Sequence, residues 1–377
     1  MDFSSFGMDE RIMEAISYMG FERPTPIQEQ AIPVIMRGGD LIACAQTGSG
    51  KTGAFILPIL NRLATQAEED GTDTLVLVPT RELAIQVDQQ IQAFAYFTGA
   101  NSIAVYGGGE AWEYAQEKTA LTSGAAIIVA TPGRLISHLN MGYVKFDRIK
   151  TLILDEADRM LDIGFYDDLV KIISFVPKNR QTLMFSATMP PKIRSLSQKI
   201  LKDPESISIS ISKPAAGVLQ AAYDVEESDK IKLIAKLVSD KPHYESILIF
   251  TSTKKRVSEI TSALKRMGMK AEGISSNLEQ SERESVLLKF RARKTRILVA
   301  TDVLSRGIDI KDINLVINYD VPGDAEDYVH RVGRTARAST TGVAITFVNK
   351  ADRGKFAAIE KLIGNRINRV PARTVLV

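Results

Sequence analysis

Short unbroken apolar runs alternate with amphipathic stretches along the whole chain. In the first half the runs read "DLIACA", "TLVLVPT", "SIAVYGG", "AAIIVATP", "TLILDEAD" and "QTLMFSAT". Runs of this kind are typical of parallel strands that are buried on both faces. Between two of them, segment 81–97 spaces its apolar residues three or four positions apart, which predicts a helix (Leu83, Val87, Ile91 and Phe94). We therefore expect a doubly wound α/β domain.

The second half repeats this scheme with "SILIFTST", "AEGIS", "TRILVATD", "LVINYD" and "VAITFV" as strands and with helices that include 254–268 and 283–294. Between the halves, "SISISISKPAAGV" has an alternating part that can complete the first sheet, followed by a linker composition. We predict two tandem parallel-sheet domains, at 1–211 and 218–365, joined by a linker at 212–217. The remaining 366–377 is a short basic tail to which the pattern assigns no structure.

Composition adds little to this picture. The chain has 377 residues, of which 45% are hydrophobic and 25% charged, as in ordinary soluble globular proteins. A net charge of +3 neither requires nor excludes nucleic-acid binding. Cys44 is the single cysteine, which excludes an intrachain disulfide and favours a reducing compartment. No apolar run approaches the ~20 residues of a membrane span, and the N-terminus is too acidic for a secretion signal, so we expect a cytosolic (cytoplasmic) protein.

The stretch "CAQTGSGKTGAF", residues 44–55, has the pattern of a phosphate-binding loop between a strand and a helix. Gly48 and Gly50 let backbone N–H groups approach phosphates, Lys51 reaches the β- and γ-phosphates, and Thr52 holds Mg²⁺. The strict pattern has glycine where this chain has Ala45, which is tolerated if that residue keeps a negative φ. The alternative is a glycine-rich turn with an incidental lysine. The predicted nucleotide contacts are Ala45, Gln46, Thr47, Gly48, Ser49, Gly50, Lys51 and Thr52.

A second nucleotide element follows the apolar run "TLIL" at 151–154. Asp155 stands at the strand end, where phosphate-loop enzymes place the acid that supports Mg²⁺. Glu156 is suited to orienting or deprotonating the attacking water, and Asp158 to hydrogen bonding with other motifs. The alternative is a solvated acidic turn at a helix start, which the helix dipole favours.

Residues 155–158 spell DEAD, and the chain from about Phe3 to about Ile363 resembles the DEAD-box RNA helicases motif by motif. The resemblance implies two RecA-like domains, ATP and Mg²⁺ as cofactors, and an RNA-stimulated ATPase that acts as a monomer. It also implies local unwinding of short duplexes, with one strand bent as the domains close. RNA is the expected partner, with protein partners for recruitment.

The stretch "GFERPTPIQ", 20–28, resembles the adenine-reading Q motif of this family. The resemblance implies that Gln28 hydrogen-bonds the adenine edge, with Thr25 beside it, and that Phe21 stacks on the ring. An amide side chain offers the donor and the acceptor that adenine requires. Core packing is the alternative for Phe21. An upstream aromatic side chain, Phe3 or Phe6, supports the pocket in this interpretation.

Two further motifs resemble family elements that couple hydrolysis to RNA. Ser186 and Thr188 of "SAT" match the motif that links ATP hydrolysis to strand separation, although such hydroxyls are also common helix N-caps. "HRVGRTAR", 330–337, implies a coupling His330 and two arginine fingers, with a basic helix face as the alternative. Catalysis would then require domain closure around ATP. The arginine fingers are Arg334 and Arg337, and Asp309 is expected near the ribose.

The resemblance places the RNA contacts in short turns that follow strands in both halves. Such turns bind phosphates without reading bases, and RNA is told from DNA through its 2′-hydroxyls. Ordinary turns and helix starts are the alternative at each position. The predicted RNA contacts are Thr80, Arg81, Gly108, Thr131 and Arg134 in the first half, and Thr251, Gln280, Arg283, Thr301, Asp302 and Arg306 in the second.

Some positions depart from the family pattern. Ser275 and Ser276 stand where many relatives have histidine and an acid, and Ser305 and Ala336 replace other small residues. Trp112, the single tryptophan, is expected to cap a local core, with base stacking as the alternative. None of these changes removes a catalytic charge. An ATP-gated RNA clamp and a DNA-directed helicase are the competing functions, and the motifs do not identify the RNA or the pathway.

Overall fold

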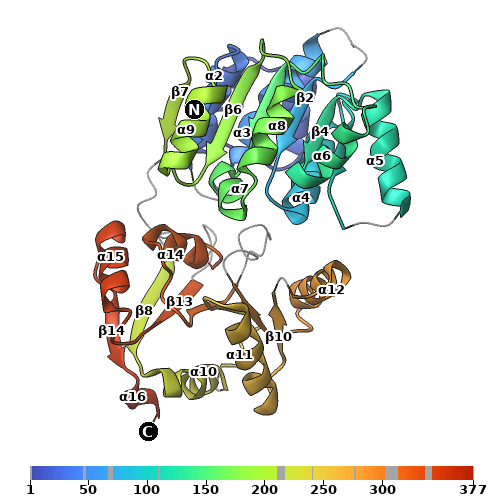
Figure 1. Ribbon diagram of the computed structural model, residues 1–377. Helices are drawn as coiled ribbons and strands as arrows, with labels where there is room; N and C mark the ends of the chain where they lie inside the picture. The colour runs from blue at the N-terminus through green and yellow to red at the C-terminus, as the bar shows by residue number, and fades with distance from the viewer. Residues whose placement is uncertain are drawn as a thin grey trace. The chain divides into compact units, whose positions relative to one another are not determined.

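The computed structural model describes residues 2–45, 48–66, 71–108, 111–209, 217–239, 241–275, 277–301, 313–335 and 342–376. The chain forms two compact units, Met1–Ser210 and Ile211–Val377 (Figure 1). Within the described ranges, none of the helices combines the length and the apolar composition that crossing a bilayer requires.

The first unit contains a sheet of seven parallel strands in the order β3-β4-β2-β5-β6-β1-β7. Every residue of β2, β4, β5 and β6 is buried, as the unbroken apolar runs predict. The alternating segment after residue 204 does complete this sheet as its edge strand β7. The strands are β1 (Leu41–Cys44), β2 (Thr74–Leu77), β3 (Ser102–Val105), β4 (Ile127–Ala130), β5 (Thr151–Leu154), β6 (Gln181–Ser186) and β7 (Glu205–Ser208).

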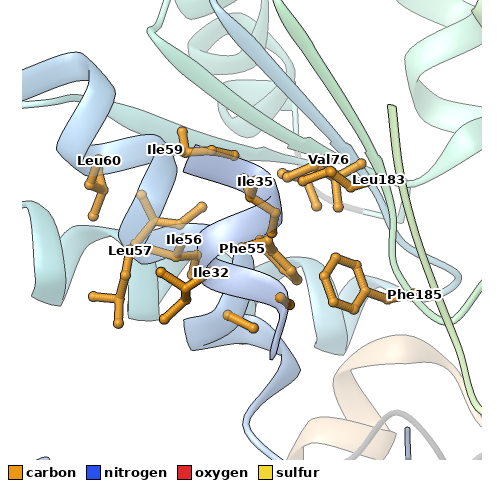
Figure 2. Packing of buried hydrophobic residues seen from close by; sticks show 14 of the residues in the cluster. Ile32, Ile35, Phe55, Ile56, Leu57, Ile59, Leu60, Val76, Leu183 and Phe185 are labelled. Atoms are coloured by element: carbon orange, nitrogen blue, oxygen red, sulfur yellow. The ribbon is translucent and has the colours of Figure 1, made fainter. Parts of the chain in front are cut away.

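Helices cover both faces of this sheet, and two apolar cores separate them from it. One core packs under α1 to α4, where the Phe55 ring of α3 meets the Phe185 ring of β6 at a centroid distance of 5.2 Å (Figure 2). The other packs under α6 to α9. The helical elements are η1 (Phe3–Phe6), α1 (Glu10–Tyr18), α2 (Pro26–Met36), α3 (Lys51–Thr65), α4 (Arg81–Ala95), α5 (Ala111–Ser123), α6 (Pro132–Asn140), α7 (Ala157–Ile163), α8 (Tyr166–Ser174) and α9 (Pro191–Ile200).

The second unit repeats the first. Its sheet has the order β10-β11-β9-β12-β13-β8-β14, which is the order of the first sheet when strands are counted from the start of each unit. The strands are β8 (Val218–Asp224), β9 (Ile247–Phe250), β10 (Ala271–Ile274), β11 (Ile297–Ala300), β12 (Leu315–Asn318), β13 (Gly342–Val348) and β14 (Asn368–Pro371). The helical elements are η2 (Glu227–Asp229), α10 (Lys230–Ser239), α11 (Lys254–Arg266), α12 (Gln280–Arg291), α14 (Ala325–Val332), α15 (Arg353–Ile363) and α16 (Arg373–Leu376).

Two strands of the second sheet are absent from the sequence prediction. Strand β8 is only partly buried and carries no apolar run, and β14 is an edge strand whose residues are mostly exposed. The basic segment 366–377 is therefore not a detached tail, because β14 pairs in parallel with β8. Of the predicted linker at 212–217, only the last residue lies within the described ranges.

Candidate functional site

The predicted motifs of the first unit meet along one edge of its sheet. In a parallel sheet the segments that follow the carboxyl ends of the strands lie at the same edge, which is where such folds bind ligands. The adjacent strands β5, β6 and β1 are followed by the acidic motif, "SAT" and the phosphate loop. The adjacent strands β3, β4 and β2 are followed by the predicted RNA turns. One edge is thus divided into a nucleotide half and a candidate RNA half.

The glycines of the phosphate loop are required by its backbone. Gly48 and Gly50 have φ values of 83° and 95°, in the left-handed region that favours glycine. A Cβ atom on Gly50 would lie 2.7 Å from the Thr25 hydroxyl oxygen, so this position has no room for a side chain. Lys51 begins α3, is 6% exposed, and its Nζ donates to the Ala45 carbonyl at 2.8 Å.

Ala45 is tolerated in the way that the sequence predicts. It is buried, its N–H donates to the Ser186 carbonyl at 3.1 Å, and it is not among the described non-glycine residues with positive φ. Ala45 therefore continues the pairing of β1 with β6 by one residue without backbone strain. Ser49 precedes Gly50, and Thr52 lies partly exposed in the first turn of α3. Gln46 and Thr47 lie outside the described residues.

The side chain of Gln28 connects α2 to the phosphate loop. Its Oε1 accepts from the Thr25 N–H at 2.9 Å, and its Nε2 donates to the Gly50 carbonyl at 3.1 Å. Gln28 is fully buried, so these contacts fix its amide against the loop. Phe21 packs edge-on against Phe94 with ring centroids 5.5 Å apart, and it adjoins the apolar core. The core-packing interpretation of Phe21 therefore has direct support.

Of the two upstream aromatic side chains, Phe3 is buried in the core, and Phe6 packs edge-on against it with more of its ring exposed.

Asp155 and Glu156, the first two acids after β5, are buried, which excludes the alternative of a solvated acidic turn at these positions. Asp155 is 3% exposed, and burial raises the pKa of its carboxyl to about 6, an effect that the nearby Lys51 charge opposes. Glu156 has φ 51°, a left-handed conformation that costs a non-glycine residue free energy and is concentrated at functional sites. Its N–H donates to Asp155 Oδ1 at 3.0 Å, and its Oε2 accepts from Arg159 at 3.2 Å.

Asp158 joins the acidic motif to "SAT". Its Oδ2 accepts from both the backbone N–H and the hydroxyl of Thr188, each at 2.9 Å. Its own N–H donates to the Ser186 hydroxyl at 3.2 Å, and that hydroxyl donates to the Thr188 carbonyl at 2.8 Å. The following helix α9 has Pro190 as its N-cap, so the N-cap interpretation of Ser186 and Thr188 is wrong.

The predicted RNA turns of the first unit are interconnected. Thr80 caps α4 by accepting from the Leu83 N–H at 3.3 Å. Arg81 donates to the Gly108 carbonyl at 3.1 Å and lies over the Tyr106 ring at 4.5 Å from its centroid. Gly108 has φ 85°, so the turn after β3 also requires a glycine.

The turn after β4 is held by α5. Thr131 is the N-cap residue of α6, and Arg134 follows in its first turn. Arg134 Nε donates to Glu117 Oε2 at 2.7 Å. Glu117 is absent from the sequence prediction, because a single acid within a charged helix gives no signal of such a contact.

Among the described candidates of the second unit, Thr251, Thr301 and Arg334 are buried. Thr251 is fully buried and donates its hydroxyl to Asp320 Oδ2 at 2.7 Å, and Thr301 is 9% exposed. Arg283 donates to the Leu278 carbonyl at 3.2 Å. Gln280 is the first residue of α12, His330 lies on α14, and Arg334 follows that helix at 8% exposure. Asp302, Arg306, Asp309 and Arg337 lie outside the described residues.

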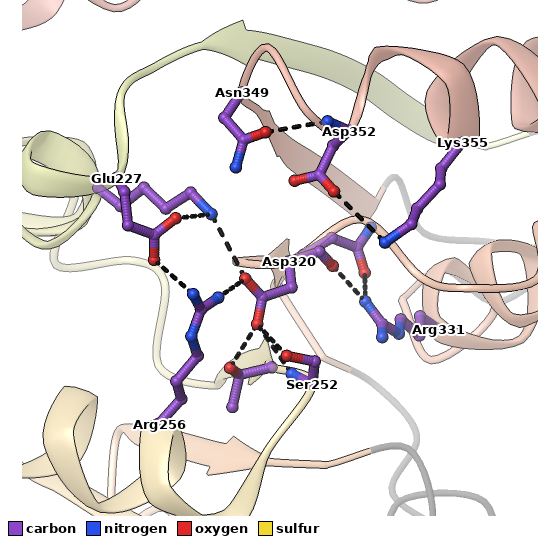
Figure 3. Close-up of polar contacts among 11 residues, drawn as sticks. Glu227, Ser252, Arg256, Asp320, Arg331, Asn349, Asp352 and Lys355 are labelled. Atoms are coloured by element: carbon purple, nitrogen blue, oxygen red, sulfur yellow. Dashed lines mark hydrogen bonds and ion pairs between the residues drawn. The ribbon is translucent and has the colours of Figure 1, made fainter.

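Asp320 organises the polar interior of the second unit (Figure 3). Its carboxylate accepts from the Ser252 N–H and hydroxyl, both at 2.9 Å, and it pairs with Arg256. It also faces Lys230 Nζ at 3.4 Å, and that ammonium is fully buried. The Asp320 carbonyl accepts from Arg331 at 2.8 Å, which ties α14 to the end of β12.

Trp112 does not cap a local core, and the expectation that it does is wrong. The side chain is 56% exposed, because it lies on the outward face of α5. Ser275, at the end of β10, is buried and accepts from the Asn277 N–H at 3.4 Å.

Comparisons with known proteins agree with this geometry. The family model described as DEAD/DEAH box helicase matches residues 25–196, and the helicase conserved C-terminal domain matches 229–339. The chain is 42% identical over 373 residues to the ATP-dependent RNA helicase CshA of Listeria monocytogenes, covering 99% of this chain and 71% of that protein. It is 40% identical to the DEAD-box ATP-dependent RNA helicase CshA of Geobacillus kaustophilus, covering 99% and 79%.

Solved structures show the same fold. Dbp5 of S. cerevisiae, bound to RNA and ADP BeF3, is 30% identical and aligns over the whole of both chains with a TM-score of 0.87. A DEAD box protein from Methanococcus jannaschii is 38% identical, with a TM-score of 0.57 over 98% of this chain and 99% of that one. Each unit of the present chain therefore has the RecA-like fold of these proteins.

Proposed function

This chain belongs to the DEAD-box family of ATP-dependent RNA helicases, and on that premise we propose how its own residues remodel RNA. The observation that carries the proposal is the division of one sheet edge between ATP motifs and RNA turns. Strands β5 and β2 are neighbours in the sheet, so the two halves of the edge adjoin. ATP binding or hydrolysis in one half therefore takes place beside the residues that bind RNA in the other.

ATP occupies the edge formed after β5, β6 and β1. The N–H groups of the phosphate loop and Lys51 hold the phosphates. Resemblance to the family assigns adenine to Gln28, whose amide atoms contact Thr25 and Gly50 in this structure and would turn to the base on binding. Thr52 and Asp155 would hold Mg²⁺, which fits a buried carboxylate that needs a cation to stay ionised. Bound ATP with Mg²⁺ supplies the electrophilic phosphate. Glu156, whose carboxylate is held by Arg159 at 3.2 Å, orients the attacking water.

RNA lies along the turns after β3, β4 and β2, where Thr80, Arg81, Gly108, Thr131 and Arg134 contact its backbone. In the proposal Thr251, Gln280, Arg283, Thr301, Asp302 and Arg306 extend this surface on the second unit. Thr251 is fully buried in this structure and donates its hydroxyl to Asp320. Because these contacts are to the RNA backbone, they bind many sequences and permit local unwinding of short duplexes.

Hydrolysis depends on RNA in this proposal because the site draws on both units. Arg334 and Arg337 belong to the second unit, and closure on ATP and RNA brings their guanidinium groups to the γ-phosphate, with Asp309 near the ribose. Asp158, Ser186, Thr188 and His330 carry the coupling. We propose that the chain acts as a monomer in the cytosol, and both points rest on the sequence.

RNA-stimulated hydrolysis tests the proposal. ATPase activity is measured alone, with a single-stranded RNA, and with DNA of the same sequence. We expect strong stimulation by RNA and little by DNA, and no activity above background for Lys51→Ala under any condition. Equal stimulation by the DNA would contradict the RNA assignment. Full activity of Lys51→Ala would instead contradict the placement of the ATP site.

A further inference from the structure

Glu117 on α5 holds three groups from two of the RNA turns. Its Oε1 accepts from the Tyr106 N–H at 2.9 Å, at the end of β3. Its Oε2 accepts from Arg134 Nε at 2.7 Å and contacts His138 Nε2 at 2.9 Å, both on α6. Glu117 is only 3% exposed. A buried carboxylate is retained where cations and hydrogen-bond donors satisfy it, as they do here.

The aromatic side chains around Glu117 fix the plane of the Arg134 guanidinium. That group lies over the Tyr114 ring at 4.5 Å from its centroid, and Tyr114 in turn stacks on His138 with centroids 4.7 Å apart. His138 is fully buried and contacts the Tyr143 hydroxyl. The Nε atom of Arg134 is thus held by the Glu117 carboxylate, and the face of its guanidinium group lies against the Tyr114 ring.

A second acid on the same face of α5 holds the other arginine. Glu113 lies four residues before Glu117, a spacing that puts both side chains on one side of a helix. Its Oε1 is 3.8 Å from Arg81 NH2, while Arg81 NH1 donates to the Gly108 carbonyl and the guanidinium covers the Tyr106 ring. Both arginines of the RNA half are therefore paired with α5.

We propose that Glu113 and Glu117, the α5 carboxylate pair, are positioning residues that orient Arg81 and Arg134 toward RNA phosphates. This inference rests on the proposed RNA contacts of these arginines. Each carboxylate engages one part of a guanidinium, and an aromatic ring engages its face. Arginine loses side-chain freedom when it is fixed, and fixing it before binding removes that cost from the RNA complex. A carboxylate pair near RNA would otherwise weaken binding by repulsion.

The sign of one substitution separates positioning from simple electrostatics. Glu117→Gln adds one net positive charge, which by charge alone strengthens phosphate binding. Positioning predicts weaker binding. In the glutamine variant the NH2 group would face one of the N–H groups whose hydrogen bond Glu117 accepts, and that contact would be lost. We expect RNA affinity to fall about five- to tenfold, as for one newly mobile side chain. Glu14→Gln is the matched control, since Glu14 is exposed on α1 and the charge change is the same.

The experiment is a double-mutant cycle on the full chain. Binding of a short fluorescently labelled single-stranded RNA, with a non-hydrolysable ATP analogue present, is measured by anisotropy for the parent, Glu117→Gln, Arg134→Ala and the double variant. We expect Glu117→Gln to weaken binding alone and to add nothing once Arg134 is replaced, with Glu14→Gln equal to the parent. A purely structural role would weaken binding equally in both backgrounds.

Unchanged or tighter binding by Glu117→Gln overturns the inference while leaving the proposed function intact. Parental binding by Arg134→Ala and Arg81→Ala overturns both, because these arginines are then not RNA contacts. Should Glu117→Gln fail to fold in thermal unfolding, the same cycle with Glu113→Gln and Arg81→Ala decides, since Glu113 is more exposed than Glu117.

Discussion

The Asp158 carboxylate accepts two hydrogen bonds from Thr188, one from its backbone N–H and one from its hydroxyl, both at 2.9 Å. Hydrogen bonds to a charged group are among the stronger ones in proteins. The contact joins the acidic motif after β5 to the "SAT" motif at the end of β6. Resemblance to the family assigns a coupling role to these residues, and this contact is the physical link on which our proposal of that role rests.

Thr188→Val removes the hydroxyl donor and keeps the backbone donor. A bond to a charged group contributes about 1.5–3 kcal/mol, so the link is weakened but not lost. We expect duplex unwinding to fall by about tenfold, while RNA-stimulated ATP hydrolysis stays within about threefold of the parent. Thr65→Val, at the exposed end of α3, is the control and leaves both rates unchanged. Parallel loss of hydrolysis and unwinding would show that Thr188 serves the chemical step instead.

Glu156→Gln keeps the shape of the side chain and removes its ability to take a proton. General-base assistance accelerates reactions by about 10²–10⁴-fold, and we expect the ATPase rate constant to fall by that amount. ATP binding, measured by equilibrium titration, is retained, so the variant accumulates with ATP and RNA bound. Glu14→Gln is again the charge-matched control. Hydrolysis at the parental rate would remove Glu156 from the catalytic residues.

Gln28→Ala removes the amide that contacts the Gly50 carbonyl and is expected to lose the preference for ATP over GTP. The measurement is the ratio of affinities for ATP and GTP in the absence of RNA. Gln30→Ala, exposed on the same helix, controls for loss of an amide side chain from α2. An unchanged ratio in Gln28→Ala would mean that adenine is recognised elsewhere.

Asp320 gives the second unit an acid-sensitive interior. Burial raises the pKa of its carboxyl, but hydrogen bonds from Ser252 and Thr251 and the Lys230 charge outweigh burial, and the net pKa is below its ordinary value. A depressed carboxyl pKa contributes stability above the unfolded value of about 3.9, and that stability is lost as pH falls through the lower folded value.

Asp320→Asn should therefore destabilise the second unit at neutral pH, by about 3–5 kcal/mol because it leaves Lys230 buried with less negative charge beside it. The difference from the parent narrows below about pH 4. Hydrogen exchange of the second unit's amides measures both values. Equal protection of parent and variant at pH 7 would show that the network around Asp320 contributes no net stability.

The apolar runs and the phosphate motifs were predictable because each is a local pattern. Buried parallel strands leave unbroken runs, and Gly48, Gly50 and Lys51 all lie within four successive residues. Strands β8 and β14 were not predictable, because an edge position and partial burial remove the apolar signal that identifies a strand. Trp112 was misjudged because a tryptophan side chain is usually largely buried. The sequence does not show that this position lies on the exposed face of α5.

The partners of the site residues were the least predictable part. Asp158 and Thr188 were both selected from sequence, but their direct contact depends on β5 and β6 being neighbours. Glu117 and Asp320 were not selected, because each acquires its role from residues distant along the chain. Contacts between residues distant along the chain depend on the order of strands in the sheet, and that order cannot be read from a single sequence.

The shared strand order of the two units gives Lys51 and Lys230 the same position. Each opens the helix that follows the first strand of its own sheet. Lys51 lies inside a loop shaped for phosphates, whereas Lys230 is sealed by Glu227 at 2.8 Å and Asp320 at 3.4 Å. The second half thus supplies its own anion, and an incoming polyphosphate would have to displace it. The same fold therefore places one lysine where an external anion can bind and the other where carboxylates of the chain already neutralise it.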